Sequence, residues 1–157
     1  MDSHSHHRSR KSINFRVHAL ASSLFKGGQQ YYGAKFGVGI PEMRLLSNLG
    51  TEGALTASQM VALTAMDKGL VSRLLSALHE RQLVTATAPA SDPRRRTWEL
   101  TEGGQKLVAE LRPVWRRREA VIQACLSEAE RDLLEDMLAR LFEASEALRA
   151  QEAKEIK

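Results

Sequence analysis

The fold is decided by the stretch from Asp67 to Thr101, which reads DKGLVSRLLSALHERQLVTATAPASDPRRRTWELT. Asp67 is a favoured helix N-cap, and Met66 and Val71 are spaced to pack across the first turn. Apolar residues then recur along one face at helical spacing, namely Leu70, Val71, Leu74, Leu75 and Leu78. This pattern predicts an amphipathic helix that begins after Asp67.

The opposite face of this helix is made of small and cationic residues up to Glu80, the first acidic one: Lys68, Gly69, Ser72, Arg73, Ser76 and Ala77. Small residues between cationic side chains let a helix approach DNA closely. An ordinary solvated surface helix explains this face about as well as a DNA-contacting helix does. The residues that follow must therefore distinguish the two interpretations.

Two short strands with a basic connection follow the helix. Leu83 to Thr87 alternates in polarity like a strand, and Thr97 to Leu100 provides a second one. The connection from Pro89 to Arg96 holds Asp92 and three successive arginines. An arginine at the tip of such a ribbon can enter the narrow minor groove, where the potential is most negative. A basic ribbon placed directly after a helix-turn-helix predicts a wing.

Three helices are predicted before Asp67. Residues 13 to about 32 form a long one with two apolar faces, which suits a helix packed between a core and a partner chain. A short buried helix runs from Pro41, a natural first residue, to Gly50, a natural stop. Thr56 opens the third, and Gln59 three residues later completes a capping box.

Two long helices are predicted after Leu100. Thr101 caps the first, which runs to about Cys125 and should be kinked by Pro113. Ser127 caps the second, with Glu130 as its capping-box partner. Leucines then form a seam at Leu134, Leu138, Leu141 and Leu148. Long terminal helices with such a seam usually pair with another chain, so we predict dimerisation.

The composition predicts one globular domain with a helical bias. Of the 157 residues, 43% are hydrophobic and 5% are aromatic. No apolar run approaches the roughly 20 residues that span a bilayer, and no signal-peptide core is visible at the N-terminus. The single cysteine, Cys125, suits a reducing compartment. We therefore expect a cytoplasmic protein with no membrane partner.

Charge is distributed unevenly. The net charge is +4, with −4 from Leu126 onward and +8 on residues 1–125, and such a basic region binds polyanions. Residues 1–12 are expected to be a disordered basic tail. Its histidines His4, His6 and His7 are better explained by that tail than by a metal site. No phosphate-binding glycine loop, zinc-protease helix or nucleophile elbow is present, so we predict neither an enzyme nor a cofactor.

These elements and their motifs resemble the MarR family of bacterial transcription regulators. Asp92-Pro93-Arg94, followed by Leu100-Thr101 and Gly103-Gly104, is similar to the family's D-x-R and L-T-x-x-G at the expected separation. Residues 67–73 look like the opening of its recognition helix, and the resemblance covers roughly residues 13–148. Gln82 departs from the pattern, because the family usually has glycine there. Glutamine in a left-handed C-cap conformation costs about 1 kcal/mol.

The resemblance implies a mostly α fold with a small β-wing. A winged helix-turn-helix lobe would occupy residues 41–100, with dimerisation helices at 13–36 and 101–150, all within a single domain of residues 13–157. The function implied is that of a homodimeric regulator, most simply a repressor, on a near-palindromic site in double-stranded DNA. Its half-sites would lie about one turn apart.

The DNA-contacting residues follow from the same resemblance. The recognition helix would place Lys68, Gly69, Ser72, Arg73 and Ser76 in the major groove. In the wing, Arg94 would enter the minor groove, Arg95 and Arg96 would contact phosphates, and Asp92 would hold the arginines in place. A winged-helix module that binds protein or RNA remains an alternative.

Members of the family commonly lose DNA affinity when a small aromatic acid or phenol binds between the dimer helices and the lobe. Residues 27–50 resemble members tied to aromatic-acid catabolism, including nicotinate degradation. The candidate ligand residues, each of which is better explained by a packing or interface role, are Arg16, His18, Ser22, Tyr31, Tyr32 and Arg44. A cysteine redox sensor is the other alternative. The apolar neighbours of Cys125 should raise its pKa, which predicts an inert buried thiol.

Overall fold

The amphipathic helix expected after Asp67 is present as α5 (Lys68–Glu80). Its N-cap is Asp67, whose Oδ1 accepts the Leu70 N–H at 2.8 Å. The apolar face is buried against the rest of the lobe, with Val71, Leu75 and Leu78 each at most 1% exposed. The cap and the apolar face, both read from the sequence, therefore position this helix as predicted.

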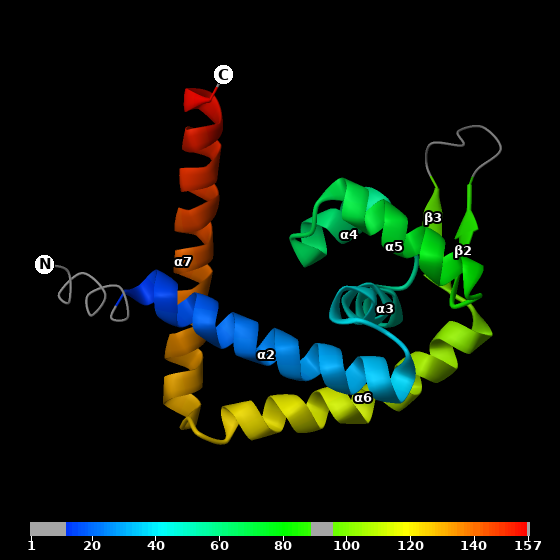
Figure 1. Cartoon of the computed structure of the whole chain (residues 1–157), viewed down its shortest axis with the longest axis horizontal. Helices are drawn as coiled ribbons and strands as arrows, with labels where there is room; N and C mark the ends of the chain where they lie inside the picture. Colours follow the sequence, from blue (N-terminus) through cyan, green and yellow to red (C-terminus); the bar gives the residue numbers. More distant parts are fainter. Residues whose placement is uncertain (1–11, 89–95, 157) are drawn as a thin grey trace, which may run out of the picture. The chain divides into compact units, whose positions relative to one another are not determined.

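The structure, a computed structural model, describes residues 12–88 and 96–156. In order, the helices in these ranges are α2 (Ile13–Phe36), α3 (Ile40–Glu52), α4 (Ala57–Thr64), α5, α6 (Glu102–Gln123) and α7 (Glu128–Glu155) (Figure 1). The chain divides into two compact units at the junction between Leu111 and Arg112. The fold is mostly helical with one small sheet, as expected.

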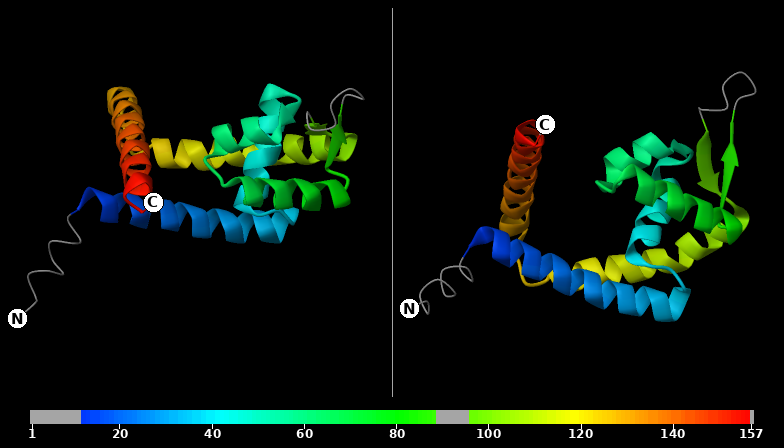
Figure 2. Two further views of the ribbon diagram at one scale, coloured as in Figure 1. Left: turned by 90° about the horizontal axis from the view of Figure 1, so that it is seen from above. Right: turned by 45° about the horizontal axis from the view of Figure 1, so that its top comes forward.

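The sheet has three antiparallel strands in the order β1-β3-β2, where β1 is Leu55–Thr56, β2 is Val84–Thr87 and β3 is Thr97–Leu100. Strands β2 and β3 are the predicted wing strands and lie side by side next to α5 (Figure 2). Strand β1, which the sequence did not predict, pairs with the central strand β3. Two residues are too few to show an alternating pattern.

The core of the first unit lies where the helix-turn-helix meets its neighbours. Side chains from four helices are essentially inaccessible to solvent, at 0–1% exposure: Leu45 and Leu46 of α3, Met60 of α4, Leu75 and Leu78 of α5, and Leu111 of α6. Burying an aliphatic side chain of this size contributes about 1.5–3 kcal/mol. This core therefore holds α5 as part of a continuous apolar cluster.

Two predicted helix ends are corrected by the structure. Helix α2 continues beyond Tyr32 to Phe36 and ends at Gly37, which has a φ of 65°. Helix α3 passes through Gly50 and ends before Gly53, which has a φ of 81°. The prediction that Gly50 stops the helix was wrong because this glycine serves packing. A Cβ there would lie 2.9 Å from Val108 Cγ1.

The junction between the wing and α6 explains the pair of motifs around Thr101. The Thr101 hydroxyl donates to the Gln82 carbonyl at 2.5 Å and accepts the Gly104 N–H at 3.1 Å. Gln82 has the left-handed conformation expected of it, with a φ of 56°. A Cβ on Gly104 would lie only 2.0 Å from the Leu83 carbonyl oxygen. The backbone of α6 can approach the start of β2 this closely only because residue 104 has no side chain.

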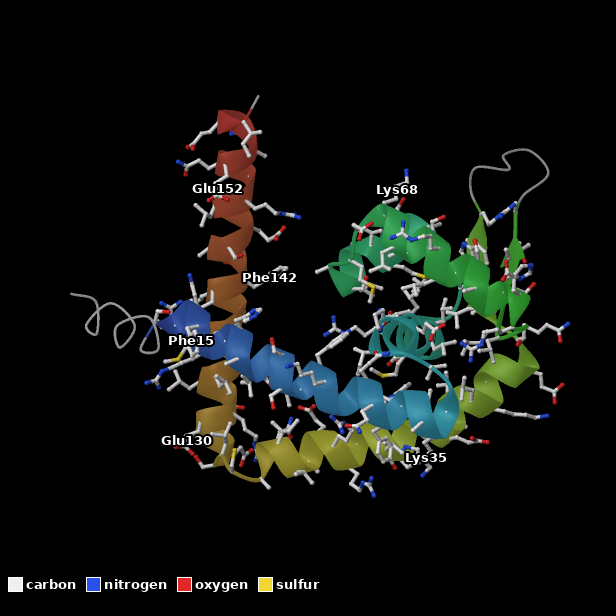
Figure 3. The ribbon with its side chains drawn as sticks, in the orientation of Figure 1. Phe15, Lys35, Lys68, Glu130, Phe142 and Glu152 are labelled. Carbon is white, nitrogen blue, oxygen red and sulfur yellow. The ribbon has the colours of Figure 1, made fainter. Side chains whose placement is uncertain are left out.

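The second unit contains the end of α6 and the whole of α7. Helix α6 continues through Pro113 to Gln123. In α7 no residue is buried, and the predicted seam is 41–54% exposed at Leu134, Leu138, Leu141 and Leu148. Further large apolar side chains on this helix are also exposed, namely Leu133, Met137 and Phe142. Figure 3 labels Phe142 on the surface of α7.

The predicted cap of α7 is confirmed. Ser127 Oγ accepts the Glu130 N–H at 3.4 Å, and Glu130 Oε2 accepts the Ser127 N–H at 2.8 Å. These hydrogen bonds from the Ser127 backbone and side chain hold the pKa of Glu130 below its ordinary value of 4.5. The charged carboxylate therefore stabilises the start of this helix.

Candidate nucleic-acid interface

The face of α5 that the sequence assigned to DNA is exposed along its whole length. Its five candidate residues are all solvent-accessible: Lys68, Gly69, Ser72, Arg73 and Ser76. Lys68 is the first residue of the helix, and its side chain points away from the lobe (Figure 3). The structure therefore brings together on one open surface the major-groove candidates that the sequence proposed.

Gly69 leaves the start of this face without a protruding side chain. A Cβ built there would lie 3.2 Å from Asp67 Oδ1, the atom that caps the helix, and 3.6 Å from Arg73 Nη1. The Arg73 guanidinium therefore lies one turn back along the helix, over the glycine. A side chain at residue 69 would contact the helix cap as well as the central cation of the surface.

The turn that leads into α5 is tight. Ala65 ends α4 with a φ of 54°, which is uncommon for a residue other than glycine. The buried Thr64 hydroxyl donates to the Met60 carbonyl at 2.6 Å and accepts the Met66 N–H at 3.4 Å. These contacts connect the last turn of α4 to the backbone of the turn that leads into α5.

The base of the wing is linked to the end of α5 through aromatic and polar contacts. His79 Nδ1 lies 3.0 Å from the Val84 carbonyl oxygen, and the His79 ring meets the Trp98 ring edge-on at 5.9 Å. The Arg96 guanidinium also lies 5.9 Å from the centre of the Trp98 ring. Arg96, predicted to contact a phosphate, is thus placed over an aromatic ring. The other wing candidates, Asp92, Arg94 and Arg95, lie outside the described residues.

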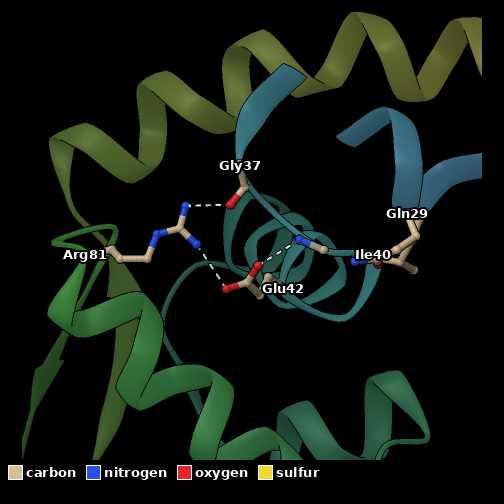
Figure 4. A network of polar contacts seen from close by, with 6 residues as sticks. Gln29, Gly37, Ile40, Glu42 and Arg81 are labelled. Carbon is tan, nitrogen blue, oxygen red and sulfur yellow. Dashed lines mark hydrogen bonds and ion pairs between the residues drawn. The ribbon is translucent and has the colours of Figure 1, made fainter. Parts of the chain in front are cut away.

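A second connection at the end of α5 was not predicted. Arg81 donates to Glu42 Oε1 and to the Gly37 carbonyl, both at 3.0 Å (Figure 4). Its partners are 39 and 44 residues away in the chain. No local pattern signals a contact over that separation, because it exists only once the turn between α2 and α3 packs beside α5.

The candidate ligand residues fall into separate groups along α2. His18 Nε2 lies 3.5 Å from Ser22 Oγ, near the start of the helix. The buried Tyr32 packs edge-on against Tyr31 at 5.9 Å near its end. Since a helix rises 1.5 Å per residue, His18 and Tyr31 are about 20 Å apart. One small ligand cannot contact both groups within one subunit. Arg16 lies with the first group, and Arg44 is exposed on α3.

Cys125 differs from its prediction. The thiol is exposed, and it donates to the Ile122 carbonyl at 3.0 Å. The expectation of burial was wrong because α6 ends at Gln123, so the apolar neighbours no longer surround the cysteine as they would within a helix. Among residues 12–88 and 96–156, no cluster of His, Cys, Asp or Glu is placed to hold a metal. His4, His6 and His7 lie outside these ranges. No helix in them could cross a membrane.

Comparisons with known proteins agree with this geometry. A model of the MarR family matches residues 36–95, which span α3 to α5 and the start of the wing. No curated protein sequence matches the chain.

Solved structures give a broader match. A MarR/EmrR family transcriptional regulator from Acinetobacter sp. ADP1 is 27% identical with a TM-score of 0.79, over 84% of this chain and 93% of the other. The MepR–DNA complex of S. aureus is 20% identical with a TM-score of 0.76, over 85% and 96%. Bordetella bronchiseptica BpsR, whose DNA binding is regulated by 6-hydroxynicotinic acid, is 21% identical with a TM-score of 0.75, over 84% and 94%. The fold of this chain is therefore that of the MarR winged-helix regulators.

Proposed function

We propose that this protein is a homodimeric, ligand-responsive transcription regulator, acting as a repressor on a near-palindromic DNA site. The observation that carries the proposal is the open, small and cationic face of α5, preceded by a tight helix-turn-helix and followed by a two-stranded wing. A helix with this surface fits the major groove, while the ribbon beside it reaches the adjacent minor groove.

Support for DNA as the partner comes from charge and from the comparisons. Residues 1–125 carry a net charge of +8, and the counterions that cations release from phosphates drive binding to a duplex. The fold is shared with MepR, which has been seen on DNA. An RNA or protein partner does not require a helix whose surface fits the major groove. Duplex DNA is therefore the partner that best explains the surface of α5.

Support for the homodimer comes from the exposed apolar surface of α7. A 28-residue helix with no buried residue leaves large apolar side chains accessible to a partner chain, and most helices in proteins are stabilised by packing of such a face. Leu134, Leu138, Leu141 and Leu148 follow the spacing of a helix–helix seam. A second copy of the same helix satisfies this spacing, and symmetry then places two recognition helices on one duplex. Helix α2 also exposes large apolar side chains, including Phe15 and Leu20.

The effector we propose is a small aromatic carboxylate, nicotinate-related compounds being the first to test. The proposal has two sources, the resemblance of residues 27–50 and the regulation of the similarly folded BpsR by 6-hydroxynicotinic acid. Because His18 and Tyr31 are too far apart to share a ligand, the effector would contact either the His18–Ser22 group or the Tyr31–Tyr32 group of one subunit. Thermal shift with benzoate, salicylate and 6-hydroxynicotinate, each against H18A and Y31A, separates these sites.

The DNA-binding proposal is tested by fluorescence anisotropy on a duplex selected from a random pool by the wild-type protein. Arg73→Ala should weaken binding to this duplex by about 1–3 kcal/mol if Arg73 reads a base edge. An equal loss on a scrambled duplex would assign Arg73 to a phosphate. Failure of the wild-type protein to enrich any duplex, together with binding to single-stranded RNA, would favour the RNA alternative.

The dimer is tested by light scattering of the chain truncated before Ser127. We expect the truncated chain to be monomeric at concentrations where the full chain is dimeric, and a dimeric truncation would refute the assignment of α7. Repeating the DNA assay after peroxide treatment, with Cys125→Ser as control, tests the redox alternative. That alternative requires a loss of DNA binding that C125S prevents.

A further inference from the structure

The end of the recognition helix is fastened to the turn between α2 and α3. Arg81 is the residue at which α5 ends, and it bridges two acceptors, the Gly37 carbonyl in that turn and Glu42 Oε1 in the first turn of α3, each at 3.0 Å. A guanidinium is planar and presents several N–H donors in fixed directions. Contact at two points therefore restrains the orientation of the Arg81 side chain as well as its position.

The two acceptors are themselves restrained, and Figure 4 shows the contacts of Glu42. Glu42 Oε2 accepts the Gly39 N–H at 2.7 Å, so both carboxylate oxygens are used. Gly37 has a φ of 65° and donates its own N–H to the Gly33 carbonyl. On the other side of the turn, Gln29 Oε1 accepts the Ile40 N–H at 2.9 Å. Arg81 is thus attached to a fixed turn.

Partial burial strengthens this contact. The Glu42 side chain is 17% exposed and the Arg81 side chain 39% exposed. The pair is less screened by solvent than the fully surface pair Asp136–Arg140 of α7, whose side chains are 61% and 73% exposed. It also joins elements far apart in the chain, whereas the α7 pair lies within one helix. Only the Arg81 contact can position one element relative to another.

Arg81 lies at the C-terminal end of α5, where a polar contact can orient the helix. The buried face of α5 consists of apolar side chains, and apolar packing has no directional preference of its own. The polar contacts at its C-terminal end supply that direction. Gln82, the next residue, has a left-handed conformation and accepts the Thr101 hydroxyl, so the same point is also the base of the wing. Reading base edges requires side chains held to within about 0.5 Å.

We propose that Arg81 and Glu42 are positioning residues, which hold α5 and the wing base in the orientation that DNA binding requires, without Arg81 itself contacting DNA. This inference rests on the proposed DNA-binding function. The competing explanation for an exposed arginine at the end of such a helix is a direct phosphate contact. The two explanations predict opposite effects for a change at Glu42.

The sharpest test is Glu42→Gln in the full chain. This substitution removes a negative charge, which by itself favours binding to a polyanion. However, an amide offers one acceptor oxygen where the structure uses two, so the turn loses either the Arg81 or the Gly39 contact. Positioning predicts a loss of affinity for the selected duplex of roughly fivefold, within the range for members of one ion-pair network. A phosphate contact predicts unchanged or stronger binding.

The companion variants are Arg81→Gln and the double variant. Positioning predicts that R81Q weakens binding about as much as E42Q, that the double variant is no worse than either, and that the slope of affinity against salt stays constant. A phosphate contact predicts that R81Q lowers the salt slope by about one. Asp136→Asn and Arg140→Gln carry the same charge changes on an ion pair outside the lobe. We expect these matched controls to preserve the wild-type preference for the selected duplex over a scrambled one.

Circular dichroism at the assay temperature checks that each variant is folded. If R81Q unfolds, Arg81→Lys replaces it, since lysine keeps the charge but lacks the planar guanidinium that donates to both acceptors. Positioning predicts weakened binding by R81K, and near wild-type binding overturns the proposal. It is also overturned if E42Q binds as well as wild type, or if the losses of E42Q and R81Q add. If the wild-type protein enriches no duplex at all, the proposed function itself fails.

Discussion

Replacing Gly104 by alanine should destabilise the lobe, because α6 packs directly on the backbone of Leu83, the residue before β2. The added Cβ would lie 2.0 Å from the Leu83 carbonyl oxygen and 3.2 Å from Leu100 Cδ2. An ordinary carbon–oxygen contact is more than 1 Å longer than the first of these distances, and a backbone carbonyl cannot rotate away as a side chain can. Overpacking of this kind costs about 1–3 kcal/mol. The cost exceeds the gain of up to about 1 kcal/mol from alanine's helix propensity.

Gly103→Ala is the matched control. A Cβ there would lie 3.5 Å from the Gln82 carbonyl oxygen, an ordinary contact distance. In the absence of a clash, the reduced freedom of the unfolded chain should raise stability by about 0.4–1 kcal/mol. Urea unfolding followed by circular dichroism, at one fixed protein concentration, measures both variants. We expect G104A and G103A to shift the free energy of unfolding in opposite directions. A G104A variant as stable as G103A would refute the reasoning.

Three further predictions address other parts of the chain. Gln82→Gly relieves a left-handed conformation and should raise stability by up to about 1 kcal/mol in thermal melts; a loss would contradict the strain argument. Gly69→Ala should leave stability within about 1 kcal/mol, because helix propensity and the contact with the Asp67 cap oppose each other. The Gly69→Ala variant should nevertheless bind DNA more weakly in anisotropy assays, and an affinity equal to that of the wild type would contradict this prediction. In the wild type, the Glu130 cap is present above pH 4.5 and is lost as pH falls through its lowered pKa. Ser127→Ala should return that pKa towards 4.5 in an NMR titration, and an unchanged value would show that Ser127 is not the cause.

Structural features that depend on residues close together in the sequence were predictable from it. The N-cap at Asp67, the capping boxes at Thr56 and Ser127 and both wing strands are confirmed, because each depends only on residues within about five positions of one another. The left-handed Gln82 was also expected from the motif around it. Local hydrogen bonds and side-chain periodicity determine these features, and both are legible in one stretch of chain.

Features that depend on packing between distant segments were not predictable. Gly50 was interpreted as a helix stop, although its role is to let α3 and Val108 approach each other. The two-residue strand β1 forms only because β3 offers it a free edge. The bridge from Arg81 to Glu42 joins residues 39 positions apart, and neither residue has a sequence neighbour that suggests the other.

The absence of buried residues in α7 has an evolutionary consequence. The side chains that stabilise the winged-helix lobe and those that form the apolar face of α7 are different residues, on different segments of the chain. If α7 pairs two chains as proposed, substitutions on that face can change which chains associate without altering the lobe's core or the surface of α5. Under the proposed function, two copies produced by gene duplication can then lose their pairing with each other while still recognising the same DNA, and diverge in their targets later.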